Sequence, residues 1–312
     1  MSISRRSLLL SAIPVGVGRF SGILSTDNSG NLPPGDVITM NSIVAERHGK
    51  DGSTLILIPG LAGGAWSWSD IVQRLSPAHE VYALTLAGFS GRAPVKAPVI
   101  DKVVADIVRF ISTKRLRQPV LVGHSLGAFI AFRVAIEHSD SIGAVIALDG
   151  FPVFSPLADM DAAGRRAAAE KLANELARGK SAQEFRAALH TFLAARMNDP
   201  EKASAMTELA ARSDPGSVAQ YIIEMLSADL RPDLGKVKAP ILAVIAADSY
   251  KRGLPDAEIR LFYTRVLANA PNAFTLLIHN AHHFIYVDQP EAVGAAIEAF
   301  LAGLQLSARR SL

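Results

Sequence analysis

The chain has 312 residues, of which 49% are hydrophobic and 20% are charged, a composition that allows a sizeable core and excludes a mostly disordered chain. It contains no cysteine, which excludes disulfides, thiolate metal sites and a cysteine nucleophile. The 32 basic residues face 29 acidic ones, and the basic excess lies in the first 25 residues, so the charge does not indicate nucleic-acid binding.

The N-terminal segment, residues 1–25, has the plan of an export signal. Arg5 and Arg6 precede a modest apolar stretch, and the segment contains no acid. The run from Ser4 to Leu9 is similar to a twin-arginine motif, which predicts export to the periplasm of a bacterium. The stretch is too short and too often broken by glycine to predict a stable membrane span. Residues 26–35, "TDNSGNLPPG", read as a linker.

Short apolar runs rich in Val, Ile and Leu predict buried strands along the rest of the chain. In order they are "VITMNSIVAE", "STLILI", "EVYALTL", "QPVLVG", "IGAVIALD", "APILAVIAA" and "AFTLLIH". Amphipathic segments of helical length lie between most of them, such as "SDIVQRLSP", "VIDKVVADIVRFISTK" and "LGAFIAFRVAIEHS". The alternation predicts an α/β fold with a mostly parallel, doubly wound sheet.

Residues 152–235 break this alternation. They contain four Ala-rich segments with helical character and no convincing strand. We therefore expect a helical cap inserted into a core made of residues 36–151 and 236–306, with a short tail at 307–312.

The stretch "VGHSLGAF" carries the clearest chemical signal. Ser125 lies between Gly123 and Gly127, after a predicted strand and before a predicted helix. In that context Gly-x-Ser-x-Gly predicts a strained turn that exposes a nucleophilic hydroxyl, with the helix N-terminus close to a developing oxyanion. His124, the variable residue of this turn, is assigned a structural role.

A serine nucleophile needs a base. His279, His282 and His283 lie in "LLIHNAHHFIYVDQPEAV". His279 closes a predicted strand and is interpreted as structural. His283 and His282 lie in the loop before the helix that opens near Pro290, and His283 is preferred as the base.

From "LIPGLAGGAWSW", "VGHSLGAF" and "HHFIYVDQPEAV", in this order, the chain resembles the α/β-hydrolase family, in its capped serine hydrolase form. The resemblance covers residues 37–305. It implies that His283, counted back from Pro290 and Glu291, is the catalytic histidine. It also implies an oxyanion hole formed by the backbone N–H groups of Leu61 and Leu126, with Gly60 as a turn residue.

The acid of the triad has two candidates. Asp248 ends the strand after the cap, where most of the family keeps its acid, but it comes early after that strand. Asp149 ends the strand before the cap, where some α/β-hydrolases place it. Asp149 is slightly preferred, and both satisfy the order Ser, Asp, His.

The predicted function is cleavage of a small or medium apolar carboxylic ester through an acyl-enzyme, with no cofactor and no metal. Phe185, Leu189, Phe192 and Met225 of the cap are candidates for lining the pocket. The alternatives are a cofactor-free perhydrolase, a C–C bond hydrolase or a non-catalytic protein that binds an apolar ligand.

Overall fold

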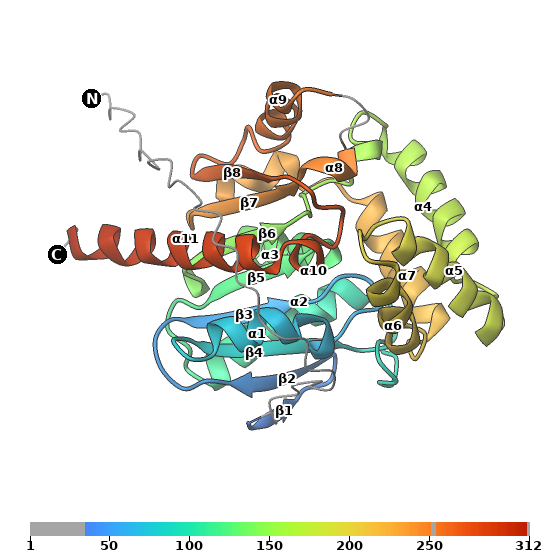
Figure 1. Ribbon diagram of the computed structural model, residues 1–312, viewed down its shortest axis with the longest axis horizontal. Coiled ribbons are helices and arrows are strands. Elements are labelled where there is room, and N and C mark those ends of the chain that lie inside the picture. Colours follow the sequence, from blue (N-terminus) through green and yellow to red (C-terminus); the bar gives the residue numbers. More distant parts are fainter. Residues whose placement is uncertain (1–34, 251–253, 311–312) are drawn as a thin grey trace, which may run out of the picture. The chain divides into compact units, whose positions relative to one another are not determined.

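The structure is a computed structural model that describes residues 35–250 and 254–310. The predicted export signal and almost all of the predicted linker lie outside the described residues. The described chain forms a sheet of eight strands in the order β1-β2-β4-β3-β5-β6-β7-β8 (Figure 1). The strands are β1 (Val37–Thr39), β2 (Ile43–His48), β3 (Thr54–Ile58), β4 (Glu80–Leu86), β5 (Val120–His124), β6 (Ala144–Leu148), β7 (Ile241–Ala246) and β8 (Ala273–Ile278).

Six of these strands run parallel, from β4 through β3 to β8, and two antiparallel strands extend the sheet at the β4 edge. The prediction of a single strand at "VITMNSIVAE" is wrong at this edge, because the segment folds into the antiparallel hairpin of β1 and β2. Ser42 lies in the turn, where its N–H and its Oγ both donate to Asp106 Oδ2, at 2.7 and 2.6 Å. This buried contact fixes the reversal of the chain, and an apolar pattern does not reveal it.

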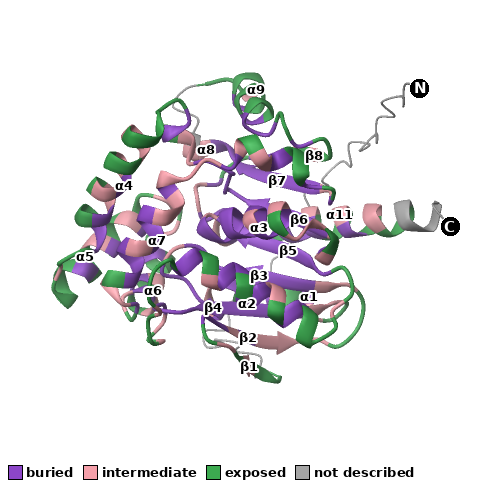
Figure 2. Ribbon diagram, turned by 180° about the vertical axis from the view of Figure 1, so that it is seen from behind, coloured by how far each residue is buried: buried purple, intermediate pink, exposed green. Residues whose placement is uncertain are grey.

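Helices cover both faces of the sheet. Helices α1 and α11 contact each other on one face, and α2 and α3 contact each other on the other face (Figures 1 and 2). Helix α9 packs beside β8. This is the predicted doubly wound arrangement. The helices of the core are α1 (Ser69–Leu75), α2 (Val99–Thr113), α3 (Leu126–Glu137), α8 (Ala247–Tyr250), α9 (Asp256–Val266), α10 (Ile285–Asp288) and α11 (Pro290–Arg310).

The segment between β6 and β7 contains four α-helices that lie together at one end of the sheet (Figure 1). Each begins directly after an Asp or Ser whose side chain accepts a backbone N–H of the first turn, which satisfies part of the helix N-terminus. We call these helices the cap, and they are α4 (Ala162–Leu176), α5 (Ala182–Ala194), α6 (Pro200–Ala210) and α7 (Pro215–Ser227).

Hydrogen bonds tie the cap to the core at several points. Both carboxylate oxygens of Glu224, on α7, accept backbone N–H groups at the start of α2, from Val99 and Ile100, each at 2.8 Å. A carboxylate at a helix N-terminus is a favourable partner for the helix dipole. The N–H of Asp214 also donates to the carbonyl of Gly88 at 2.7 Å. The start of α7 and its later turns are therefore both fixed to the core.

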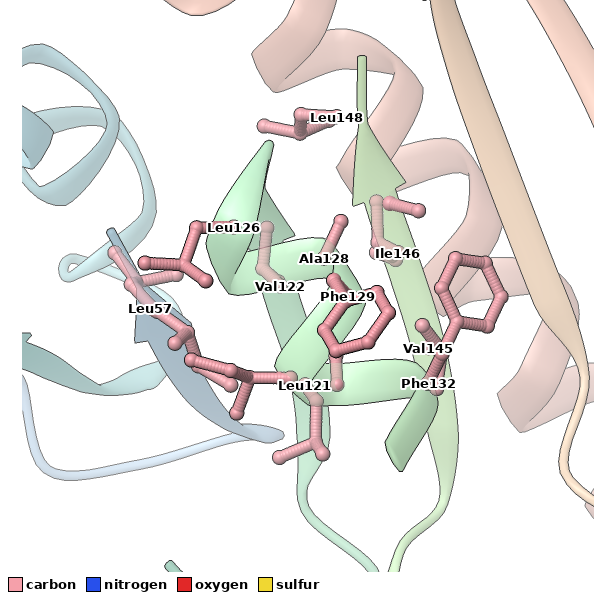
Figure 3. Packing of buried hydrophobic residues seen from close by; sticks show 14 of the residues in the cluster. Leu57, Leu121, Val122, Leu126, Ala128, Phe129, Phe132, Val145, Ile146 and Leu148 are labelled. Atoms are coloured by element: carbon pink, nitrogen blue, oxygen red, sulfur yellow. The ribbon is translucent and has the colours of Figure 1, made fainter. Parts of the chain in front are cut away.

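The centre of the molecule is an apolar layer between the sheet and α3. Phe129 and Phe132 of α3 lie against the buried side chains of β5 and β6, among them Val122 and Ile146 (Figure 3). These residues are at most 2% exposed, so the turn that joins β5 to α3 stands on a closely packed base. In the described residues, no helix is both long and apolar enough to cross a membrane.

Candidate active site

Ser125 is the single residue between β5 and α3. Its backbone has φ 51° and ψ −114°, outside the regions that L-residues ordinarily adopt. A side-chain carbon at Gly123 would lie 2.3 Å from the backbone of Gly127, and one at Gly127 would lie 2.0 Å from the Ile58 carbonyl oxygen. The two glycines are therefore required by close backbone contacts, as the motif predicted. The turn leaves Ser125 partly exposed at the floor of a cavity.

His283 meets this serine from the loop after β8. Its Nε2 lies 2.9 Å from Ser125 Oγ, although the two residues are 158 positions apart. His282 turns to the cap instead, where its Nδ1 lies 2.8 Å from Asn198 Oδ1. His279 lies at the surface and pairs with Asp256 at 3.0 Å. Of the three histidines, the structure brings only His283 to the serine.

Asp149 lies on the other side of the His283 ring. Its Oδ2 is 2.8 Å from His283 Nδ1, and its side chain is fully buried. The Oδ1 atom accepts the N–H of Ala246 at 3.0 Å, which fixes the orientation of the carboxylate. Because a carboxylate only accepts, His283 Nδ1 carries the hydrogen and Nε2 presents a lone pair to the Ser125 hydroxyl. This is the tautomer that a general base needs.

Asp248, the other candidate, has a different position. Its Oδ2 accepts the N–H of Ala281 at 3.1 Å, and its own N–H donates to the Ala281 carbonyl at the same distance. The hydrogen-bond partner of His283 Nδ1 is therefore Asp149, and Asp248 is hydrogen-bonded to the loop that leads to the histidine. The sequence signal for this difference was that Asp248 comes early after β7. This position places Asp248 opposite Ala281.

Two backbone N–H groups are available near the serine. The Leu61 N–H lies in the turn after β3 and has no hydrogen-bond acceptor among the described residues. Leu126 begins α3, and the first N–H groups of a helix have no partner within it. A side-chain carbon at Gly60 would lie 2.6 Å from His124 Nδ1, so this turn needs glycine for close contact. Both amides suit a developing oxyanion.

The cavity above Ser125 measures about 730 Å³ and lies between the core and the cap. Its walls are mainly aliphatic and aromatic, and Phe192 and Met225 are among them, as predicted. Phe185 and Leu189 do not line it, which corrects that part of the prediction. They are at most 2% exposed, and their face of α5 belongs to the interior of the cap, where α5 packs against α6.

Comparison with known proteins identifies the family. Residues 55–296 match the family model described as "Alpha/beta hydrolase family", which covers most of the chain. The chain belongs to the alpha/beta hydrolase family. The match includes the serine, the histidine, both aspartates and the whole cap, and it confirms the family predicted from the three motifs.

Individual relatives of this alpha/beta hydrolase differ in the reactions that their names state. N-formylmaleamate deformylase of Pseudomonas putida is 33% identical over 128 residues, which are 40% of this chain and 45% of the deformylase. The chain thus matches less than half of that relative's length. The human (Lyso)-N-acylphosphatidylethanolamine lipase is 22% identical over 297 residues, 86% of this chain and 84% of the lipase. Both of these relatives are named for a hydrolytic reaction, a deformylation in one and the cleavage of a lipid in the other.

A solved structure gives the same fold. The esterase from Thermogutta terrifontis superposes with a TM-score of 0.69 at 19% identity, covering 86% of this chain and 99% of the esterase. At this identity the likeness concerns the fold of the alpha/beta hydrolase and not its substrate.

Several polar residues that line the cavity were not found by the sequence analysis. Arg196 follows α5, and its guanidinium lies 4.0 Å from the centre of the Phe192 ring. Glu258 and Ser249 also line the cavity, from α9 and α8. None of the three belongs to a motif. Arg196 comes from the segment between β6 and β7, and Ser249 and Glu258 come from helices of the core, so only the folded chain brings them together at this alpha/beta hydrolase site. No group of three or more potential metal ligands occurs in the described residues.

Proposed function

We propose that this protein is a serine hydrolase that cleaves a carboxylic ester of modest size through a covalent acyl-enzyme. The observation that supports this proposal is the continuous chain of contacts from Ser125 through His283 to Asp149, with distances of 2.9 and 2.8 Å. Ser125, at one end of this series of contacts, lines a mainly apolar cavity of about 730 Å³, which is large enough for a small or medium ester.

In the acylation step, Ser125 Oγ attacks the carbonyl carbon of the ester. His283 Nε2 takes the hydroxyl proton as the new C–O bond forms, and the buried Asp149 carboxylate stabilises the imidazolium. The negative charge on the carbonyl oxygen is stabilised by the N–H groups of Leu61 and Leu126. Each such donor typically lowers the barrier by about 2.7–4 kcal/mol.

The imidazolium then donates its proton to the departing alkoxide, and the ester C–O bond breaks. An alcohol leaves, and the acyl group remains on Ser125. In the second half of the reaction, water replaces the alcohol: His283 takes one water proton, the hydroxyl adds to the acyl carbon, and Ser125 leaves with that proton. The carboxylic acid is released, and every group returns to its first protonation state.

Hydrolysis of an amide or formamide is the second candidate. The name of the Pseudomonas putida relative, a deformylase, supports it. The same residues would perform this reaction, with His283 donating its proton to the leaving nitrogen. A panel of matched acetate, formate, formamide and acetamide substrates separates the two candidates by their kcat/KM values.

Labelling with a fluorophosphonate tests the serine mechanism. We expect the phosphonate adduct on Ser125, located by mass spectrometry, and loss of both labelling and ester turnover in Ser125→Ala. The matched control is Ser155→Ala, which removes a hydroxyl from the wall of the same cavity and retains both. A folded parent protein that neither labels nor turns over any ester contradicts the proposal and favours an apolar-ligand-binding protein.

We also propose that the protein is exported to the periplasm. Support comes from the sequence of residues 1–25 alone, in which Arg5 and Arg6 precede the apolar stretch.

A further inference from the structure

His124 occupies the centre of the site without belonging to the triad. It is the last residue of β5, directly before Ser125, and it is 1% exposed. Its ring centre lies 4.9 Å from those of His283 and Phe284 and 5.0 Å from that of Tyr286. The imidazole is thus enclosed by aromatic residues from the loop that carries the proposed base and from the helix that follows it.

A single hydrogen bond joins His124 to the backbone of that loop. His124 Nε2 lies 2.8 Å from the carbonyl oxygen of His283. A carbonyl only accepts, so Nε2 carries the hydrogen and the ring is held in one tautomer. Burial lowers the pKa of His124 well below its ordinary value, which keeps the ring neutral.

The edge of the His124 ring that carries Nδ1 lies close to Gly60, in the turn that carries Leu61. Its Nδ1 is buried and has no hydrogen-bond partner among the described residues. It is also the atom that leaves no room for a side chain at Gly60. A buried acceptor without a partner is unfavourable, so packing alone does not explain why the ring is an imidazole and not an apolar ring of similar size. The hydrogen bond that Nε2 donates to the His283 carbonyl does explain the choice of an imidazole.

We propose that His124 is a positioning residue, which sets the distance between Ser125 and His283 by holding the His283 carbonyl and the Gly60 turn against the end of β5. This inference rests on the proposed serine mechanism. His124 is covalently linked to the nucleophile, hydrogen-bonded to the residue that acts as base, and in contact with the turn that carries an oxyanion donor. Proton transfer needs a heavy-atom distance of about 2.6–3.2 Å, so a small shift of the His283 backbone reduces turnover.

Three substitutions separate the donor from the ring. His124→Phe keeps a planar ring but removes the donor. His124→Gln places an amide N–H near the former Nε2, whereas the shorter His124→Asn places it near the former Nδ1. We expect kcat to fall about 10- to 100-fold in the Phe and Asn variants with KM little changed, because misplacement affects the chemical step. His124→Gln should recover most of the lost kcat.

The matched control removes another hydrogen bond to the same loop. Gln289 Nε2 donates to the Asn280 carbonyl at 2.9 Å, at the surface, and Gln289→Ala should leave kcat unchanged. Thermal denaturation and fluorophosphonate labelling rates accompany the kinetics. The labelling rate should fall in parallel with kcat, while the melting temperature should not follow the order of the kcat values.

These measurements distinguish failure of the positioning role of His124 from failure of the proposed serine mechanism. If the parent protein does not label at Ser125, the serine mechanism itself is wrong. If the parent labels and turns over ester but His124→Phe or His124→Asn matches its kcat, the positioning role is wrong. It is also wrong if His124→Gln is as slow as His124→Phe, or if kcat follows the melting temperature across the series, which would indicate a merely structural role.

Discussion

Asp149 and Asp248 show how backbone position decides the role of a carboxylate. Both follow neighbouring strands of the sheet, β6 and β7, and both are close to the loop that carries His283. Asp149 accepts from the imidazole itself, whereas Asp248 accepts from the Ala281 backbone two residues before it. We therefore expect their substitutions to act on different quantities.

Asp149→Asn should lower kcat about 10⁴-fold, because the amide N–H₂ group favours the His283 tautomer that has its hydrogen on Nε2 and cannot accept the serine proton. Asp248→Asn keeps an oxygen that can accept from Ala281, so its kcat should stay close to that of the parent. Its free energy of unfolding should fall by about 1 kcal/mol, because a neutral amide oxygen makes a weaker hydrogen bond than a carboxylate oxygen. Steady-state kinetics and urea denaturation of the two variants measure both effects. Equal losses of kcat would contradict this assignment.

The residues of the site differ in how far the sequence predicts them. Ser125 and its two glycines are predicted by a motif because the strained turn demands those residue types at a fixed spacing of two positions. The acid is not, because either aspartate satisfies the chain order and only the paths of the loops after β6 and β7 distinguish them. Arg196 and Glu258 carry no signal at all, since their common feature is the cavity wall and not a spacing along the chain.

At the scale of the elements, the parallel strands and the helices between them are predicted well. Their short, continuous apolar runs are typical of strands in a sheet that is covered on both faces. The hairpin of β1 and β2 was missed because its reversal depends on the contact of Ser42 with Asp106, 64 residues away. The cap residues that line the cavity were predicted only in part. The apolar stripe of α5 shows that one side of this helix is buried, but not whether the cavity or another helix covers it.

The packing of α3 against β3 gives a prediction at this scale. Gly127→Ala would place a carbon 2.0 Å from the Ile58 carbonyl oxygen, so the start of α3 must move. We expect a loss of about 1–3 kcal/mol or more in the free energy of unfolding, together with a large loss of turnover. Gly303→Ala in α11 is the matched control, since its added carbon meets no atom within 4 Å. It should stabilise the protein by about 0.5–1 kcal/mol.

Denaturant unfolding followed by circular dichroism measures both glycine variants. If Gly127→Ala unfolds at the denaturant concentration of the parent, the close contact at the turn is not a constraint. If this variant does not accumulate as soluble protein while Gly303→Ala does, the contact is confirmed in its strongest form.

At the scale of the whole molecule, the cavity between cap and core should set the preferred substrate length. Met225 lies in its wall on α7. Met225→Trp should reduce the ratio of kcat/KM for octanoyl over acetyl p-nitrophenyl esters about tenfold, because a filled pocket excludes methylene groups. Leu261→Trp, on the exposed side of α9, should leave that ratio unchanged. A ratio unaffected by Met225→Trp would place the acyl chain elsewhere.

The export proposal concerns the full chain. Replacing Arg5 and Arg6 together by lysine should retain the protein in the cytoplasm of a bacterial host, because twin-arginine recognition depends on the pair. Cell fractionation and immunoblotting of the parent and the double variant give the measurement. A parent protein found only in the cytoplasm would contradict the proposal directly.

The hydrogen bonds from Glu224 to the start of α2 have a consequence for behaviour at an oil–water boundary. A cap that had to open at an oil–water interface before substrate could enter would give a rate that increases abruptly once the substrate exceeds its solubility limit. Here the cap is hydrogen-bonded to the core through Glu224 and Asp214. An opening movement of the cap would therefore break several hydrogen bonds at once. The initial rate of ester hydrolysis should therefore increase smoothly as the ester concentration passes its solubility limit, and it should saturate on dissolved ester molecules.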